Sequence, residues 1–362
     1  MRGLYKMRIL VAIPHFFRPD ADGKYGSARR DPRPRIAALS QGIQALHSLF
    51  NTRQIAFQDQ PQQGLQIQQV NQWTSCELNI LLCTTGDRHL LSQLPVSRHL
   101  FQHIALDCPD RELGFYCQRV LGDRLSENYD YYCYLEDDLT IRDPLFFLKQ
   151  QWFQSLLGEA AILQPHRFEW SNPWLNNSLA AGSLATGEVG ECSDSSTSHL
   201  VSSTHPDVLG SNHPESHHSA NYHKVYVDPD FESKTGQNPG FAHHFTERRV
   251  LVGQFLGQPI QFQRAGNPHA GCFFLTRSQM TLWASTVDFG QPSNQFIGPL
   301  ESAASLHLMR YFRVYKPALS WANFLEIEHW GQYNSQDLLN NLHLVQFQPK
   351  VVSYAANNFP NG

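Results

Sequence analysis

The sequence predicts an α/β protein: a single domain built on a mixed, mostly parallel sheet with helices on both faces, interrupted by a long polar insertion. Three observations predict it. Short apolar runs of strand composition alternate with amphipathic helical segments. Several of the runs end abruptly in polar or charged residues, as strands do at the carboxyl edge of a sheet. The chain has 362 residues, of which 41% are hydrophobic, enough for a large core.

The first half alternates strands and helices in this way. Arg8–Ile13 predicts the first strand, and apolar residues from Ile36 to Leu49 recur at helical spacing. Gln54–Phe57 predicts a short strand, and the Gln-rich stretch that follows, to Trp73, predicts a surface loop. The remaining elements expected here are strands at Leu78–Cys83, His103–Leu106, Tyr131–Leu135 and Ala160–Gln164, with helices at Arg111–Leu125 and Pro144–Leu156.

Composition divides the chain into four parts. Residues 1–170 hold the alternating elements, and residues 171–222 form an insertion or lid rich in Ser, His and Asn with little periodicity. Regular patterns resume over residues 223–350, and residues 351–362 predict a loose tail. The second half predicts a hairpin of Val250–Phe255 and Pro259–Gln263, a strand at Cys272–Leu275, a helix from Leu300 to Phe312 and a strand at Phe324–Ile327.

Charge, cysteines and missing motifs exclude several classes of protein. Lys and Arg number 28 against 32 Asp and Glu, so a broad nucleic-acid surface is not expected. No apolar run has the length of a membrane span. The seven cysteines form no CxxC pair and suit free thiols in a reducing compartment, so we expect a cytoplasmic protein. The sequence has no GxxxxGK[ST], GxGxxG or GxSxG motif.

The strand at Tyr131–Leu135 leads directly into three acids, Glu136, Asp137 and Asp138. Adjacent carboxylates repel one another, and a divalent cation removes that cost. Oxygen ligands suit Mn²⁺ or Mg²⁺, which recruit substrate phosphates as further ligands. Neighbours in an extended chain point in opposite directions, so we expect Asp138 to bind the metal directly and Glu136, on the same side, to reach a metal-bound water or a ribose. The alternative is a solvated acidic loop that precedes a helix.

The strand, Glu136-Asp137-Asp138-Leu139 and the helix start Pro-Leu-Phe-Phe together resemble the DxD-type motif of GT-A-fold glycosyltransferases. The match is closest to the EDD form in the N-acetylglucosaminyltransferase I family and covers Tyr129–Phe147. The resemblance implies a GT-A, Rossmann-like fold and a Mn²⁺ ion that holds the diphosphate of a UDP-sugar. It also implies that residues 1–170 bind the nucleotide sugar, with Asp137 near the sugar. That family has an N-terminal membrane anchor, which is not visible in this sequence.

Contacts to the donor are expected at the ends of other strands. Pro14 and His15 follow the first strand, where such folds bind a nucleoside; the alternative is an ordinary junction. Asp87 follows the strand at Leu78–Cys83 and can accept a hydrogen bond from a base or ribose. Arg119 precedes the acidic motif on a helix and can bind a phosphate, unless it is a plain surface arginine.

The resemblance places the catalytic base and acceptor site in residues 223–350. Glu301 begins a late helix and is the expected general base, although acids also favour helix starts for electrostatic reasons; Asp288 is the alternative base. His269 and Gly271 lie in a segment expected to line the donor sugar. His329 follows the last strand and is expected at the metal or diphosphate, with a structural histidine as the alternative.

The sequence therefore predicts a metal-dependent, inverting glycosyltransferase, a hexosyl- or N-acetylhexosaminyltransferase. It would move a sugar from a nucleotide-diphosphate donor, UDP-linked by resemblance, to a hydroxyl of a carbohydrate or other acceptor. One rival is a Mg²⁺-dependent nucleotidyltransferase, which needs a basic, Gly-rich loop after the first strand; Gly23-Lys24-Tyr25-Gly26 with Arg29 and Arg30 offers one. The other is a non-catalytic, GT-A-like carbohydrate-binding protein.

Overall fold

A computed structural model describes residues 6–19, 26–52, 54–60, 64–71, 76–171, 223–228, 250–293, 304 and 307–331. Its contacts divide the chain into two compact units, residues 1–169 with 225–362 and residues 170–224. The elements considered below lie in the first unit, apart from the ends of two strands. The predicted insertion at 171–222 and the predicted tail at 351–362 fall outside the described residues, except for residue 171.

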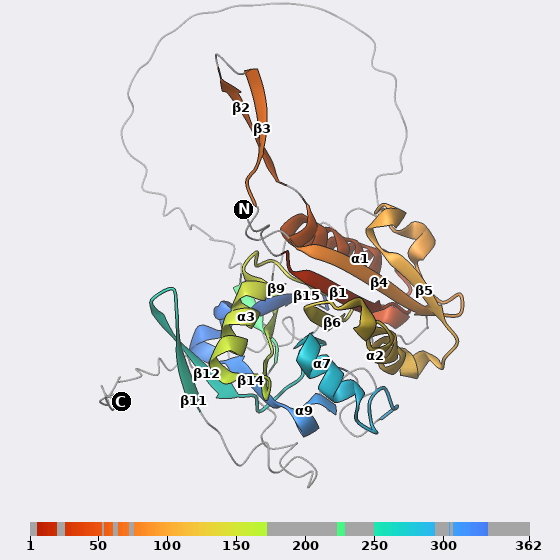
Figure 1. The fold of residues 1–362 in the computed structure, drawn as a ribbon. Coiled ribbons are helices and arrows are strands. Elements are labelled where there is room, and N and C mark those ends of the chain that lie inside the picture. Colours follow the sequence, from red (N-terminus) through yellow and green to blue (C-terminus); the bar gives the residue numbers. More distant parts are fainter. Residues whose placement is uncertain are drawn as a thin grey trace, which may run out of the picture. The chain divides into compact units, whose positions relative to one another are not determined.

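Five strands form the main sheet, in the order β13-β6-β1-β4-β5 (Figure 1). β6, β1, β4 and β5 are parallel, and β13 is antiparallel to β6 at one edge. The bounds are β1 Arg8–Pro14, β4 Glu77–Thr85, β5 Gln102–Leu106, β6 Tyr131–Leu135 and β13 Cys272–Thr276. Each lies within two residues of its predicted range, and the predicted α/β fold with a mostly parallel sheet is confirmed.

The two faces of this sheet carry separate hydrophobic cores, because successive side chains of a strand point to opposite faces. In β1, Ile9, Val11 and Ile13 pack in one core with residues of α1 and α3. Leu10 and Ala12 pack in the other core with residues of α2 and α7. Figure 1 shows α1 and α2 on opposite sides of the sheet. The helices are α1 Arg33–Leu46, α2 Leu113–Asp123, α3 Phe146–Leu157, α7 Arg277–Ala284 and α9 His307–Tyr311.

Two smaller four-stranded sheets, with strand orders β11-β12-β14-β8 and β10-β9-β15-β7, complete the frame of the site. Their strands are β7 Leu139–Thr140, β8 Ala161–Leu163, β9 His166–Ser171, β10 His223–Tyr226, β11 Val250–Phe255, β12 Gln258–Arg264, β14 Arg313–Pro317 and β15 Glu326–His329. The short strand β7 directly follows the acidic triplet and pairs with β15. The predicted hairpin at residues 250–263 is confirmed.

The Gln-rich stretch is a hairpin, so the loop predicted there is wrong. β2 Ile55–Gln60 and β3 Gly64–Gln69 pair antiparallel, with Phe57 opposite Ile67. Apolar residues alternate with glutamines, which is the two-residue period of a strand. Phe57 and Ile67 are 62% and 63% exposed. The predicted helix from Leu300 to Phe312 corresponds to α9, and residues 300–303 fall outside the described part of the chain.

The cysteines that the structure describes are free thiols. Short helical turns connect the strands and helices. The 3₁₀ turns are η1 Gly26–Ala28, η3 Leu91–Gln93, η4 Arg98–Leu100, η5 Asp110–Glu112, η6 Leu125–Glu127 and η8 Leu319–Phe324, and η2 His47–Asn51 is a π turn. Within the described residues, no helix has both the length and the apolar character that crossing a membrane requires.

Candidate functional site

The acidic triplet Glu136-Asp137-Asp138 lies at the carboxyl end of β6, a fully buried strand. The chain adds β4 and β5 on one side of β1 and β6 on the other, so the order of strands reverses between β1 and β6. In open α/β sheets, ligands bind in the crevice at such a switch point. Three backbone hydrogen bonds hold the triplet there: Glu136 N to Gly271 O (2.9 Å), Leu139 N to Glu136 O (3.1 Å) and Trp330 N to Asp138 O (2.9 Å).

Asp137 points into the protein and is only 4% exposed. The backbone N–H of Leu90 donates to His15 Nε2 at 3.0 Å, so the ring proton lies on Nδ1. That Nδ1 donates to Asp137 Oδ2 at 2.6 Å. Arg35 Nε donates to the same oxygen at 3.0 Å, and Arg35 Nη2 pairs with Oδ1. Both oxygens of Asp137 are therefore used inside the protein, and His15 joins the end of β1 to the end of β6.

Asp138 differs from Asp137 because one of its carboxylate oxygens has no hydrogen-bond partner among the described residues. Arg35 Nη1 donates to Asp138 Oδ2 at 2.7 Å, and His329 Nε2 lies 3.7 Å from the same oxygen. Asp138 Oδ1 is buried and has no hydrogen-bond partner among the described residues. His329 Nδ1 is bound to Glu169 Oε1 at 2.8 Å, which orients the ring with Nε2 towards Asp138. A carboxylate behind a histidine is the usual support for a metal-binding imidazole.

Asp138 and His329 supply two ligands, fewer than the four protein ligands of a structural zinc site. The described residues contain no group of three or more His, Cys, Asp or Glu side chains arranged to hold a metal. A cation here would bind Asp138 and His329 and complete its shell with water and phosphate oxygens, as Mg²⁺ and Mn²⁺ do. Burial raises the pKa of Asp138, but the charges of Arg35 and His329 outweigh burial and hold that pKa below its usual value. The carboxylate is therefore ionised.

Gly271 adjoins Glu136 at the edge between β6 and β13. Its φ is +63°, and an added Cβ would lie 2.6 Å from Glu136 Oε2. Glycine therefore allows both the backbone conformation and the close approach of the carboxylate. His269, two residues earlier, is 6% exposed. Burial, followed by the nearby charge of Arg167, holds the pKa of His269 well below its usual value, so the ring is neutral.

A buried ion network lies next to the triplet, and sequence patterns did not predict it. Asp228 Oδ1 accepts from Arg167 Nε at 2.9 Å and from Nη2 at 2.7 Å. Lys316 Nζ donates to Asp228 Oδ2 at 3.1 Å and to His269 O at 2.7 Å. The charge of Arg167 also lowers the pKa of Asp138. Two cations against one carboxylate leave a positive excess that faces the acids.

Two further predicted residues lie at the same edge of the sheet. Pro14 is the last residue of β1 and pairs in register with Cys83 of β4. Asp87 is exposed in the turn that follows β4. Because β1 and β4 are parallel neighbours, Pro14 and Asp87 lie at the edge where His15 binds Asp137.

The other candidates make contacts elsewhere. Arg119 Nε donates to Gly290 O at 2.9 Å, and its guanidinium stacks 4.3 Å from the ring centre of Tyr116, so α2 holds it in a packing role. Among the described residues, no hydrogen bond or ion pair joins Arg119 to the acidic triplet. Glu301 falls outside the described residues, and its predicted role as the base stays a prediction.

Asp288, the alternative base, is already engaged. Tyr311 Oη donates to Oδ1, and Arg310 Nη1 donates to Oδ2. Burial raises its pKa, but the hydrogen bonds from Tyr311 and Arg310 outweigh burial, so the pKa lies below the usual value of a carboxyl group. A carboxylate stabilised in this way is a weak proton acceptor.

Arg35 is another residue of this site that sequence reasoning missed. It lies in the first turns of α1 and joins two acids more than 100 positions later in the chain. The available signal was the arginine-rich segment after the first strand, where Arg29, Arg30, Arg33 and Arg35 lie within seven residues. Such a segment follows β1 into the switch point, so at least one of these side chains can reach the acids.

Comparisons with known proteins add little to this picture. No known protein family and no curated protein matches the sequence. Among solved structures, the chain is similar to a CMP:2-keto-3-deoxy-manno-octonic acid synthetase complexed with CTP. The TM-score is 0.34 and the identity 11%, over 94% of this chain and 98% of that chain. The resemblance to the N-acetylglucosaminyltransferase I family therefore stays a prediction that rests on residues 129–147.

Proposed function

We propose that this protein is a divalent-cation-dependent transferase that binds a nucleotide sugar, as donor or as product, at the carboxyl ends of β1 and β6. One observation carries the proposal: Asp138 keeps a buried oxygen without a partner among the described residues, and His329 Nε2 faces the same carboxylate. A buried, unpartnered carboxylate oxygen is costly unless a ligand satisfies it. A cation at this point supplies that ligand.

The residues around the cation have different roles: some would bind it and others would orient its ligands. Asp138 and His329 hold it, and Glu169 keeps the imidazole oriented through its 2.8 Å hydrogen bond. A bound Mn²⁺ or Mg²⁺ neutralises the charge that develops on a departing phosphate group. Arg35 is anchored on Asp137 by Nε and Nη2, and Nη1 reaches Asp138. Because a cation would bind the other oxygen, Oδ1, Arg35 can keep this contact and hold the Asp138 carboxylate in place.

Glycosyl transfer is the first candidate reaction. It needs a base that takes the proton from the acceptor hydroxyl as that oxygen attacks the anomeric carbon. Asp288 is held by Tyr311 and Arg310, which disfavours it as that base. We therefore assign the role to Glu301. The two variants Glu301→Gln and Asp288→Asn separate these assignments, because the true base is lost in only one of them.

Nucleotidyl transfer is the second candidate, and the arginines after β1 favour it. Four arginines lie between residues 29 and 35, and Arg35 contacts the metal-binding carboxylate. A nucleotidyltransferase needs such a segment to hold a triphosphate while a sugar oxygen attacks the α-phosphorus and pyrophosphate departs. The same cation site serves both reactions, so products decide between them.

The first experiment tests the cation site. Titration calorimetry measures the binding of UDP-, GDP-, CMP- and dTDP-sugars to the wild type, with Mn²⁺ and with EDTA. We expect at least one sugar nucleotide to bind only with Mn²⁺ and Asp138→Asn to abolish that binding. Asp123→Asn, an exposed carboxyl at the end of α2, is the matched control and keeps it. Binding that is indifferent to Mn²⁺ and to Asp138→Asn would refute the proposal.

The second experiment identifies the reaction. The protein is incubated with the sugar nucleotide and an acceptor panel, and separately with nucleoside triphosphates and a panel of sugars and sugar phosphates. Acceptor-dependent release of the nucleotide in the first mixture, a diphosphate from UDP-, GDP- and dTDP-sugars or CMP from a CMP-sugar, indicates glycosyl transfer. Release of pyrophosphate in the second indicates nucleotidyl transfer. Metal-dependent binding with neither product would favour the non-catalytic carbohydrate-binding protein.

A further inference from the structure

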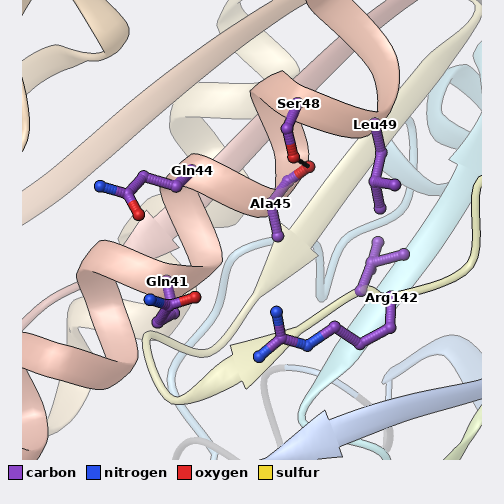
Figure 2. A pocket seen from close by; sticks show the side chains of 7 residues that line it. Gln41, Gln44, Ala45, Ser48, Leu49 and Arg142 are labelled. Carbon is purple, nitrogen blue, oxygen red and sulfur yellow. Dashed lines mark hydrogen bonds between the residues drawn. The ribbon is translucent and has the colours of Figure 1, made fainter. Parts of the chain in front are cut away.

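A pocket of about 300 Å³ opens between α1 and the segment that follows β7, outside the cation site (Figure 2). Its residues on α1 recur at the spacing of one helical face, and its opposite wall is the dipeptide after β7. Gly42 brings the two walls together, because an added Cβ there would lie 3.0 Å from Leu139 O. The lining residues are Gln41, Gln44, Ala45, Ser48, Leu49, Ile141 and Arg142.

The lining combines an apolar floor with polar groups at the rim. Leu49 is partly exposed and presents hydrocarbon, Ala45 and Ile141 are buried, and the exposed side chains of Gln41 and Gln44 present amide donors and acceptors. A sugar ring has the matching surface, with C–H groups on its face and hydroxyls around its edge. Side-chain amides can both donate to and accept from such hydroxyls.

Arg142 adds a cation to one wall of the pocket. Its Nε donates to Glu328 Oε2 at 2.6 Å, and its side chain is 46% exposed. Within the described part of the chain, its terminal nitrogens have no hydrogen-bond partner, and Figure 2 shows the guanidinium reaching towards Gln41. A guanidinium can bind two carboxylates at once, as Arg35 does with Asp137 and Asp138. The free edge of Arg142 therefore suits an anionic group.

The pocket adjoins the cation site through two elements. Arg142 follows Asp138 by four residues, a separation of at most about 13 Å along an extended chain. On α1, Gln41 follows Arg35 by six residues, which is about 9 Å along the helix axis. Glu328, the partner of Arg142, immediately precedes His329 in β15. A molecule that occupies the pocket can thus extend towards the carboxylates.

We propose that this pocket is an acceptor subsite that binds a sugar ring carrying an acidic group, with Arg142 on the acid and Gln41 and Gln44 on the hydroxyls. The assignment of the ring to the acceptor rests on the proposed function. The binding of an acidic sugar ring does not rest on the proposed function, because it needs neither the cation nor a nucleotide.

Binding of methyl β-glucuronide, methyl β-glucoside and acetate is measured by calorimetry in EDTA without nucleotide. We expect the glucuronide to bind at least tenfold more tightly than either comparison compound, the first lacking the acid and the second the ring. Methyl glucoside 6-phosphate is the second acidic probe and distinguishes a carboxylate from a phosphate on the ring. Equal binding of glucuronide and glucoside, or of glucuronide and acetate, would overturn the proposal.

Variants then locate the binding. Ser48→Tyr fills the pocket from an exposed position and should abolish glucuronide binding, and Arg142→Gln should weaken it at least tenfold. Arg142→Lys keeps the positive charge beside Glu328 and serves as a check in case Arg142→Gln fails to fold. It should bind the glucuronide weakly and should have the same stability to unfolding as the wild type. Gln102→Ala, an exposed glutamine at the start of β5, is the control. Unchanged glucuronide binding in Ser48→Tyr would contradict the acceptor subsite. Mn²⁺-dependent nucleotide binding, measured separately, would still decide on the proposed function.

Discussion

Gly271→Ala tests whether the close approach to Glu136 serves the site and not the stability of the fold. At Gly271 the φ is +63°, and a new Cβ would lie 2.6 Å from Glu136 Oε2. The left-handed backbone costs an alanine about 1–2 kcal/mol. The carboxylate is the mobile end of a side chain, so it can withdraw by 0.4–0.8 Å, the difference between 2.6 Å and the 3.0–3.4 Å of tight contacts.

Gly257→Ala is the matched control, because Gly257 also has a positive φ, +78°, and a Cβ there would meet nothing within 4 Å. Urea unfolding should show a loss of about 1–2 kcal/mol in both variants, from the backbone alone. A displacement approaching 1 Å can cost on the order of 100-fold in rate. We therefore expect Mn²⁺-dependent donor binding or turnover to fall at least tenfold in Gly271→Ala only. Equal function in the two variants would refute the reasoning.

Three more predictions concern buried charges. Arg35→Gln leaves Asp137 buried without its cation, so urea unfolding should show a loss of about 3 kcal/mol; a loss near zero would contradict the pairing. Asp228→Asn deprives two buried cations of their carboxylate and should cost about 3–5 kcal/mol, whereas Asp59→Asn on the exposed hairpin should cost almost nothing in the same assay. Burial and the nearby charge of Lys316 lower the pKa of His166 from 6.5 to about 4. Between pH 6.5 and pH 4 this histidine is therefore protonated more in the unfolded chain than in the folded one. His166 alone should therefore contribute a loss of about 3 kcal/mol in stability from pH 6.5 to pH 4, and His166→Gln should make the fall seen in pH-dependent unfolding smaller by that amount.

The sequence predicted the main sheet and the location of the acids well, because both leave local signals. The five strands are dense apolar runs, and Glu136-Asp137-Asp138 interrupts the most buried of them. The first strand of the hairpin was predicted at Gln54–Phe57, but the second, Gly64–Gln69, was mistaken for a loop because glutamines dominate its composition and conceal the alternation of its apolar residues.

The partners of the acids could not be predicted, because they are distant in the chain. Arg35 is separated from Asp138 by 103 positions, and Arg167 from Asp228 by 61. Periodicity and capping report only on neighbours within a few residues. His15 was predicted at the site as a nucleoside contact, yet its ring holds Asp137, which depends on the parallel pairing of β1 with β6.

The antiparallel pairing of β13 with β6 has a consequence for folding during synthesis. Residues 136–271 separate the two strands, so one edge of β6 has no partner when it leaves the ribosome. At about 5–20 residues per second, the wait lasts roughly 10 s. During that time the aromatic edge of β6 is open to other chains. A fragment that ends near residue 170 would keep this edge unpaired, because β13 lies in the second half of the chain.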